Sequence, residues 1–127
     1  MLTVRNTVRP SAIAGNGLFT TQDIAKGQEV WVESPHNVLI TQEVYDLLHP
    51  VQQECVLNFS YRTEQGYHIC IDNAKYMNHA TNPNLHEIIN DDGKVVDVAL
   101  RDIAAGEELT IDYHIFDLDA ARKLGHV

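Results

Sequence analysis

Three short motifs bring together residue types that can bind a small charged molecule. Asn78-His79 precedes an Asn82-Pro83-Asn84 turn, and a run at residues 106–113 ends in Tyr113. An asparagine amide offers donors and an acceptor, so it can pair with both the ammonium and the carboxylate of an amino acid-like ligand. Near the N-terminus, the glycines of Gly15-Asn16-Gly17 let backbone groups approach a ligand without a Cβ atom in the way.

Each motif also has a simpler structural interpretation. Taken alone, the Gly-x-Gly is a turn, the Asn-His pair is a polar turn, and residues 106–113 are a turn and a strand with a core tyrosine. Gly15-Asn16-Gly17 does not form a dinucleotide-binding fingerprint, because the third glycine is missing and residues 18–21 do not open a helix. The sequence therefore argues against a Rossmann-type methyltransferase.

We expect no metal site. The seven histidines include no ligand signature such as His-Glu-x-x-His, and Cys55 and Cys70 are too few for a four-cysteine zinc site. Both cysteines are expected to be reduced, buried thiols. Glu107 and Glu108 are interpreted as a solvated turn rather than an acid–base pair, and Trp31 as a core residue.

The elements that must position these motifs are many short strands. Alternating and β-branched runs predict strands at residues 3–8, 18–21, 29–33, 67–71, 88–89, 94–101 and 109–113. Asn90-Asp91-Asp92-Gly93 predicts a hairpin turn between two of them.

Helices are expected to be few and short. Thr41 is a candidate N-cap for a helix over about 41–49. Pro50 is expected to open a second short helix, with Val51, Cys55 and Leu57 facing inward. Asp117 is expected to cap a closing helix that runs through Leu124 and ends near Gly125.

Length and charge bound the class of protein. A chain of 127 residues predicts one domain over residues 1–127. It has no apolar run of the ~20 residues that a membrane span needs, and no signal-peptide core at its start. The formal net charge of -9 argues against direct nucleic-acid binding and suits a basic partner, although acidity for solubility alone is the competing explanation.

Taken together and in order, the motifs resemble those of SET-domain protein-lysine methyltransferases. Residues 15–30 are similar to the N-terminal SET motif, residues 72–79 to its Asn-x-Ala-Arg-Phe-Ile-Asn-His run, and residues 106–113 match Gly-Glu-Glu-Leu-Thr-x-Asp-Tyr in seven places. The chain departs from the pattern at Lys75 and at Ala80-Thr81. The C-terminal tail has no cysteine, so the resemblance is to minimal stand-alone members of viral and bacterial type without a post-SET zinc module.

The resemblance implies a mostly β fold, the knotted SET-domain (β-clip) fold of short strands and hairpins with a few short helices. Within it, about 1–33 form the N-terminal motif region, about 34–70 a variable insert, about 71–113 the C-terminal motif region and 114–127 a tail. The implied activity is S-adenosylmethionine-dependent methylation of a lysine on a basic, histone-like protein, by direct in-line transfer. The implied catalytic residue is Tyr113, and the implied cofactor-binding residues are Gly15, Asn16, Gly17, Asn78, His79 and Phe116. The implied substrate lysine channel consists of Tyr76, Ile111 and Tyr113, with one of Tyr61 or Tyr67 from the insert.

Two other functions remain open at this point. One is a non-catalytic module that keeps the SET fold and binds basic tails, and the other is a methyltransferase of a non-histone protein or a small amine. We expect no membrane or direct nucleic-acid partner and a soluble intracellular location, which is cytoplasmic, or nuclear in a eukaryotic cell or host. Homodimer formation is left open by the sequence.

Overall fold

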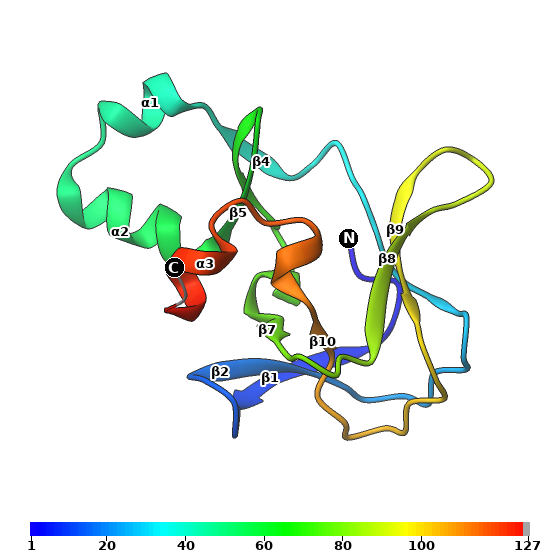
Figure 1. Cartoon of the computed structure of the whole chain (residues 1–127). Coiled ribbons are helices and arrows are strands. Elements are labelled where there is room, and N and C mark those ends of the chain that lie inside the picture. Colours follow the sequence, from blue (N-terminus) through cyan, green and yellow to red (C-terminus); the bar gives the residue numbers. More distant parts are fainter. Residues whose placement is uncertain (126–127) are drawn as a thin grey trace.

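Short strands and helices alternate along the computed structural model, which describes residues 1–125 (Figure 1). The last two residues of the predicted tail, 126–127, lie outside the described residues. The strands are β1 (Asn6–Pro10), β2 (Asn16–Thr20), β3 (Glu29–Val32), β4 (Val38–Ile40), β5 (Ser60–Thr63), β6 (Gly66–Ile69), β7 (Asn78–His79), β8 (Leu85–Ile89), β9 (Val95–Ala99) and β10 (Thr110–Ile111). The helices are α1 (Gln42–Asp46), α2 (Pro50–Phe59) and α3 (Ala120–Leu124), with 3-10 turns η1 (Asn73–Tyr76) and η2 (Tyr113–Ile115).

The strands form several small sheets rather than one large one. β1 pairs with β2, β3-β9-β8 and β4-β6-β5 form three-stranded antiparallel sheets, and β7 pairs with β10 in parallel. In the β7–β10 pair, Asn78 lies opposite Thr110 and His79 opposite Ile111. This short pairing brings the second and third sequence motifs side by side (Figure 1).

The core is built largely from the motif segments themselves. Buried side chains from all three segments pack together in one cluster, and the aromatic rings of Tyr113 and Phe116 pack against it. Burying one such aliphatic side chain is worth ~1.5–3 kcal/mol, so the motif backbones are held rigidly. The buried members are Val4, Leu18, Ile24, Val30, Met77, Leu85, Ala99, Ile103, Leu109 and Ile111.

The insert confirms the predicted helix starts but not the predicted inward face. The Val44 amide donates to the Thr41 hydroxyl at the start of α1, and α2 begins at Pro50. The expectation for α2 was wrong at two of its three residues, because Val51 is 66% exposed and Cys55 is also exposed. Leu57 is partly buried and lines the cavity, and Val56 is the buried residue of that helix. The prediction that both thiols are buried is therefore wrong for Cys55 and confirmed for Cys70.

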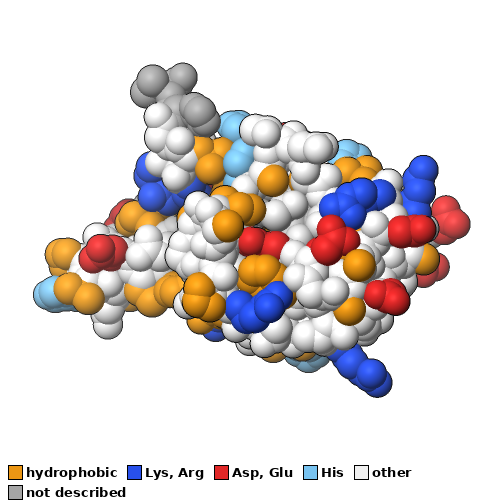
Figure 2. Space-filling view, turned by 90° about the horizontal axis from the view of Figure 1, so that it is seen from below, with side chains coloured by type: hydrophobic (Ala, Val, Ile, Leu, Met, Phe, Trp, Pro, Cys, Tyr) orange, Lys and Arg blue, Asp and Glu red, His pale blue; other side chains and the backbone are white. Residues whose placement is uncertain are grey.

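The physical reason for this difference is that the two insert helices project from the body of the molecule. Figure 2 shows hydrophobic side chains gathered on this projecting end, while acidic and basic side chains are interspersed over the other end of the same face. α1 has no buried residue. Helical periodicity indicates a face, but here little core lies against that face.

The C-terminal motif region forms the predicted hairpin and then departs from the predicted strand. Gly93 sits in the β8–β9 turn with φ +77°, a conformation that glycine adopts without steric cost. β10 ends at Ile111, so the expected strand to Tyr113 is wrong, and Tyr113 instead opens η2. α3 ends at Gly125 as predicted, but Asp117 lies ahead of the N-cap residue, Asp119.

Among residues 1–125, no helix combines the length and apolar character that crossing a membrane would require.

Candidate active site

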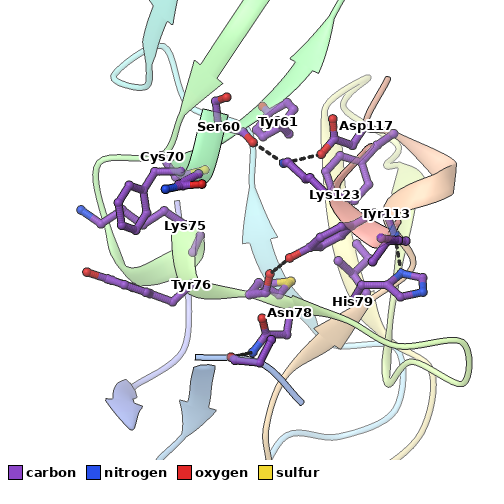
Figure 3. A pocket seen from close by; sticks show the side chains of 18 of the residues that line it. Ser60, Tyr61, Cys70, Lys75, Tyr76, Asn78, His79, Tyr113, Asp117 and Lys123 are labelled. Carbon is purple, nitrogen blue, oxygen red and sulfur yellow. Dashed lines mark hydrogen bonds and ion pairs between the residues drawn. The ribbon is translucent and has the colours of Figure 1, made fainter. Parts of the chain in front are cut away.

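One large cavity collects the motif residues. Its volume is about 860 Å³, within the range of ligand pockets, and it is lined by the loop before β2, the segment from the end of α2 into β5, residues 74–79, and the chain from Ile111 into α3 (Figure 3). One wall is completed by residues of β3, β8 and β9.

Asn78 is fixed at one side of this cavity by acceptors from distant segments. Its amide nitrogen donates to the Ala14 carbonyl at 3.1 Å, to the Asn16 carbonyl at 3.3 Å and to Glu108 Oε2 at 2.9 Å. Gly15 makes the turn between those carbonyls with φ +45°. The cavity wall is therefore rich in acceptors, and the amide oxygen of Asn78 is the atom that can accept from a ligand cation.

Gly17 has a different role from the one expected. It is not among the residues that line the cavity, whereas Gly15 and Asn16 are. A Cβ atom at Gly17 would lie 2.4 Å from Glu108 Oε2. Glu108 in turn accepts from the Ser11 hydroxyl at 2.7 Å, so the prediction that it is a solvated turn residue was wrong. A Cβ atom at 17 would displace the Glu108 carboxylate from the position in which it holds Asn78.

His79 positions the backbone of the tyrosine motif. Its Nδ1 accepts from the Tyr113 amide at 3.1 Å, which requires the lone pair of that nitrogen. Asp112 Oδ1 lies 3.5 Å from the same nitrogen but is bonded to His114 at 3.0 Å. The three side chains could gather around a cation, but since Nδ1 of His79 already serves Tyr113, we assign the group to positioning η2 and derive no metal chemistry from it.

Tyr113 projects into the cavity as a neutral phenol. Its hydroxyl donates to the Met77 carbonyl, the residue directly before Asn78 (Figure 3). Burial, aided by the charges of Asp117 and Glu108, raises the pKa of Tyr113 to about 12. The phenol oxygen keeps acceptor lone pairs, so it can orient an N–H group of a substrate while it remains protonated.

Aromatic rings surround Tyr113. Phe116 lies edge-on to it with ring centroids 6.0 Å apart, and Tyr61 lies edge-on to Phe116 at 5.5 Å. Ile111, 2% exposed, also lines the cavity. Burial is the main cause that raises the pKa of Tyr61 far above its ordinary value, so it too stays uncharged. This side of the cavity is therefore largely aromatic and apolar.

Comparison with known proteins identifies this arrangement. A family model described as the SET domain matches residues 15–114. The chain belongs to the SET domain family. The motif order, the short strands with few helices and the shared cavity agree with that membership.

Solved structures with the same fold include chains of Polycomb Repressive Complex 2 from Chaetomium thermophilum. A humanized mutant bound to the inhibitor GSK126 matches with TM-score 0.62 and 25% identity, over 94% of this chain and 16% of that chain. An autoinhibited form bound to S-adenosylmethionine matches with TM-score 0.63 and 23% identity, over 96% and 16%. A Plasmodium falciparum protein named as a histone methyltransferase matches with TM-score 0.60 and 18% identity, over 88% and 95%.

The SET domain brings all but one of the expected channel residues to the cavity. Tyr76 lines it, edge-on to Phe59 at 5.8 Å. Tyr67 is not among the lining residues: its ring stacks on Tyr45 at 4.6 Å and its hydroxyl donates to Gln42 at 3.3 Å. Of the two candidates from the insert, Tyr61 is the one at the cavity.

Sequence reasoning missed Lys123. Its ammonium donates to Asp117 Oδ2 at 2.6 Å and to the Ser60 carbonyl, and it lies 5.4 Å from the centre of the Tyr113 ring (Figure 3). Asp117 is almost fully buried. The pair holds α3, which lies beyond the residues matched by the family model, over the ring of Tyr113. No local sequence pattern predicts this contact between distant segments.

Proposed function

We propose that this SET domain is an S-adenosylmethionine-dependent protein-lysine N-methyltransferase that acts on a basic protein such as a histone tail. The observation that carries the proposal is the β7–β10 pairing, which sets Asn78 and Tyr113 beside one cavity of about 860 Å³. A binding module for basic tails would need no pocket of this size next to the Asn-His motif.

The residues present suit this cofactor. The carbonyls of Ala14 and Asn16, with the Asn78 amide oxygen, form an acceptor-rich side suited to the ammonium of an amino acid-like group. The ring of Phe116 offers an apolar surface for a planar base. When bound, the cofactor supplies an electrophilic methyl group on a sulfonium.

The chain's own residues then have to align the substrate amine and favour its neutral form, whose proton is lost to solvent water before transfer. Alignment in a fixed site is worth ~7–11 kcal/mol. The Tyr113 oxygen orients the amine, and the apolar surroundings of Ile111 and Phe116 disfavour its ammonium form, whose unperturbed pKa is about 10.4. Lys123 contributes by neutralising Asp117, so that buried carboxylate does not stabilise a charged substrate amine near Tyr113.

Incubation with S-adenosylmethionine and core histones or other basic proteins tests the proposal. Mass spectrometry should find added methyl groups on lysine, and Tyr113→Phe is the matched variant with reduced transfer. Methylation of a small amine but of no protein would favour the alternative substrate class. Binding of S-adenosylhomocysteine and basic proteins without any transfer would favour the non-catalytic module.

A further inference from the structure

A row of three side chains on the other wall of the cavity has no place in the proposed chemistry. In the β3-β9-β8 sheet, Trp31 lies opposite Asp97, and Asp97 lies opposite Glu87. Residues directly opposite on neighbouring strands project to the same face. All three residues line the cavity, so the sheet presents an indole and two carboxyl groups, side by side, to the same space as Tyr113.

This acidic row is costly for folding. Like charges directly opposite each other on adjacent strands repel. Asp97 is only 7% exposed, and its Oδ1 atom is buried with no hydrogen-bond partner among residues 1–125. A buried acceptor without a partner costs ~1–3 kcal/mol. Such a polar group, aimed into a cavity, indicates a ligand that completes it.

The neighbouring groups leave the row short of positive charge. The groups that interact with the row are acidic or neutral: Glu33, Tyr61 and the Cys70 thiol. The ammonium of Lys123, another group at the cavity, is already paired with Asp117. The N-terminal ammonium lowers the pKa of Asp97, but burial has the larger effect and raises it. In the same way, His86 lowers the pKa of Glu87, and burial outweighs that effect. The Trp31 indole N–H also lacks a hydrogen bond of normal geometry, although it is near enough to oppose the burial-driven rise in the pKa of Cys70.

We infer that the row of Trp31, Asp97 and Glu87 binds an arginine side chain of the substrate, next to the lysine that is methylated. A guanidinium is planar and presents several N–H donors, so it can bond both carboxylates at once. It also stacks on an indole face, and it is more weakly hydrated than an ammonium. The substrate class is therefore a peptide that carries arginine close to its target lysine.

The inference rests on the proposed function for the nature of the ligand, and its test is independent of turnover. The probes are synthetic peptides with a single lysine and one arginine at each neighbouring position in turn, each matched by a peptide with citrulline, which has the shape of arginine without its charge. Calorimetry measures binding of each pair. At the best position we expect arginine to bind about tenfold more tightly than citrulline, the effect of one charge-assisted hydrogen bond.

Three variants identify the site. Asp97→Asn and Glu87→Gln each remove one carboxyl group that can pair with a guanidinium, and each should bring the arginine-to-citrulline ratio close to one. Glu43→Gln, an exposed residue of α1, changes the net charge equally and should leave the ratio unchanged. Thermal unfolding shows whether each variant folds. If Asp97→Asn does not fold, the arginine-to-citrulline ratio of Glu87→Gln decides whether the row is the site, because Glu87 is only half-buried.

Three results would overturn the inference: no arginine preference in the native protein, a ratio unchanged by both cavity variants, or an equal gain from a second lysine in place of arginine. An arginine preference without methyl transfer would leave the inference standing and refute the proposed function.

Discussion

Replacing Tyr113 by phenylalanine removes one hydroxyl from the centre of the cavity and leaves the ring. The ring contacts of Tyr113 with Phe116 and Lys123 are retained, so the aromatic surface should persist. Two effects remain. The substrate amine loses the oxygen that orients it, and the buried Met77 carbonyl loses its donor.

The two effects have separate magnitudes. One well-placed hydrogen bond is worth ~1.5 kcal/mol, so turnover should fall tenfold or more. An unpaired buried carbonyl costs ~1–3 kcal/mol of folding free energy, which lowers the melting temperature by several degrees. Affinity for S-adenosylhomocysteine should change less than about twofold, because Asn78 and its acceptors are untouched.

The assay is single-turnover methyl transfer followed by mass spectrometry, with cofactor affinity measured by calorimetry on the same preparation. Tyr67→Phe is the matched control, since it removes a phenol hydroxyl that is outside the cavity and should leave turnover near that of the native protein. Because the pKa of Tyr113 is about 12, its ionisation should not appear in the rate between pH 7 and 9. Native-like turnover in Tyr113→Phe would refute the assigned role.

Four further predictions test other parts of the molecule. Asn78→Ala should weaken S-adenosylhomocysteine binding at least tenfold in calorimetry, because it removes the amide oxygen and releases the loop carbonyls; unchanged affinity would place the pocket elsewhere. Burial raises the pKa of Asp97 in the folded protein to about 7, above its ordinary 3.8. The unfolded chain therefore releases this proton at lower pH than the folded protein does, so the free energy of unfolding is highest below about pH 4 and falls by up to ~4 kcal/mol as the pH rises to about 7. Urea unfolding at pH 5 and pH 8 should show a smaller pH effect in Asp97→Asn, and an equal effect would contradict the burial argument. Lys123→Ala removes the cation beside the buried Asp117 carboxylate, which keeps the backbone amides of Arg62 and Asp119 as donors, and should lower the unfolding free energy by up to ~3 kcal/mol; a change below 1 kcal/mol would show that the pair is not desolvated. The Ile111 side chain cannot hydrogen-bond a water beside the substrate amine, so the native protein should add two or three methyl groups. Ile111→Tyr should shift the product, read by mass spectrometry, to monomethyl-lysine. A native product that stops at one methyl group under excess cofactor would contradict this.

Local chemistry explains which parts of the fold were predictable. The Asp92-Gly93 hairpin and the starts of α1 and α2 depend on residues within a few positions of each other, and all three are confirmed. The inward face predicted for α2 depended on a core that is not beside it. Tyr113 leaves β10 for a 3-10 turn because its amide bonds to His79, a partner from another strand.

The acidic row of Trp31, Asp97 and Glu87 also could not be predicted from local sequence patterns. Asp97 lies in the run Val95-Val96-Asp97-Val98-Ala99, where alternation suggests that the polar residue faces solvent. Val96 and Asp97 are nevertheless both buried, and Asp97 lies on the cavity side of the sheet. Lys123 was missed, and Glu108 was misinterpreted as a solvated turn residue, for a related reason: the partners of each lie far away in the sequence.

The parallel pairing of β7 with β10 also has a consequence for the order of folding. A strand pair of two residues that joins distant segments gains few hydrogen bonds, yet it requires closing a long loop that contains the whole β8–β9 hairpin. Because local contacts form faster than non-local ones, we expect hairpins such as β1–β2 and β8–β9 to form before this parallel pair. Asn78 and Tyr113 therefore meet at a late step of refolding, and catalytic competence should be regained after the circular dichroism signal of the strands.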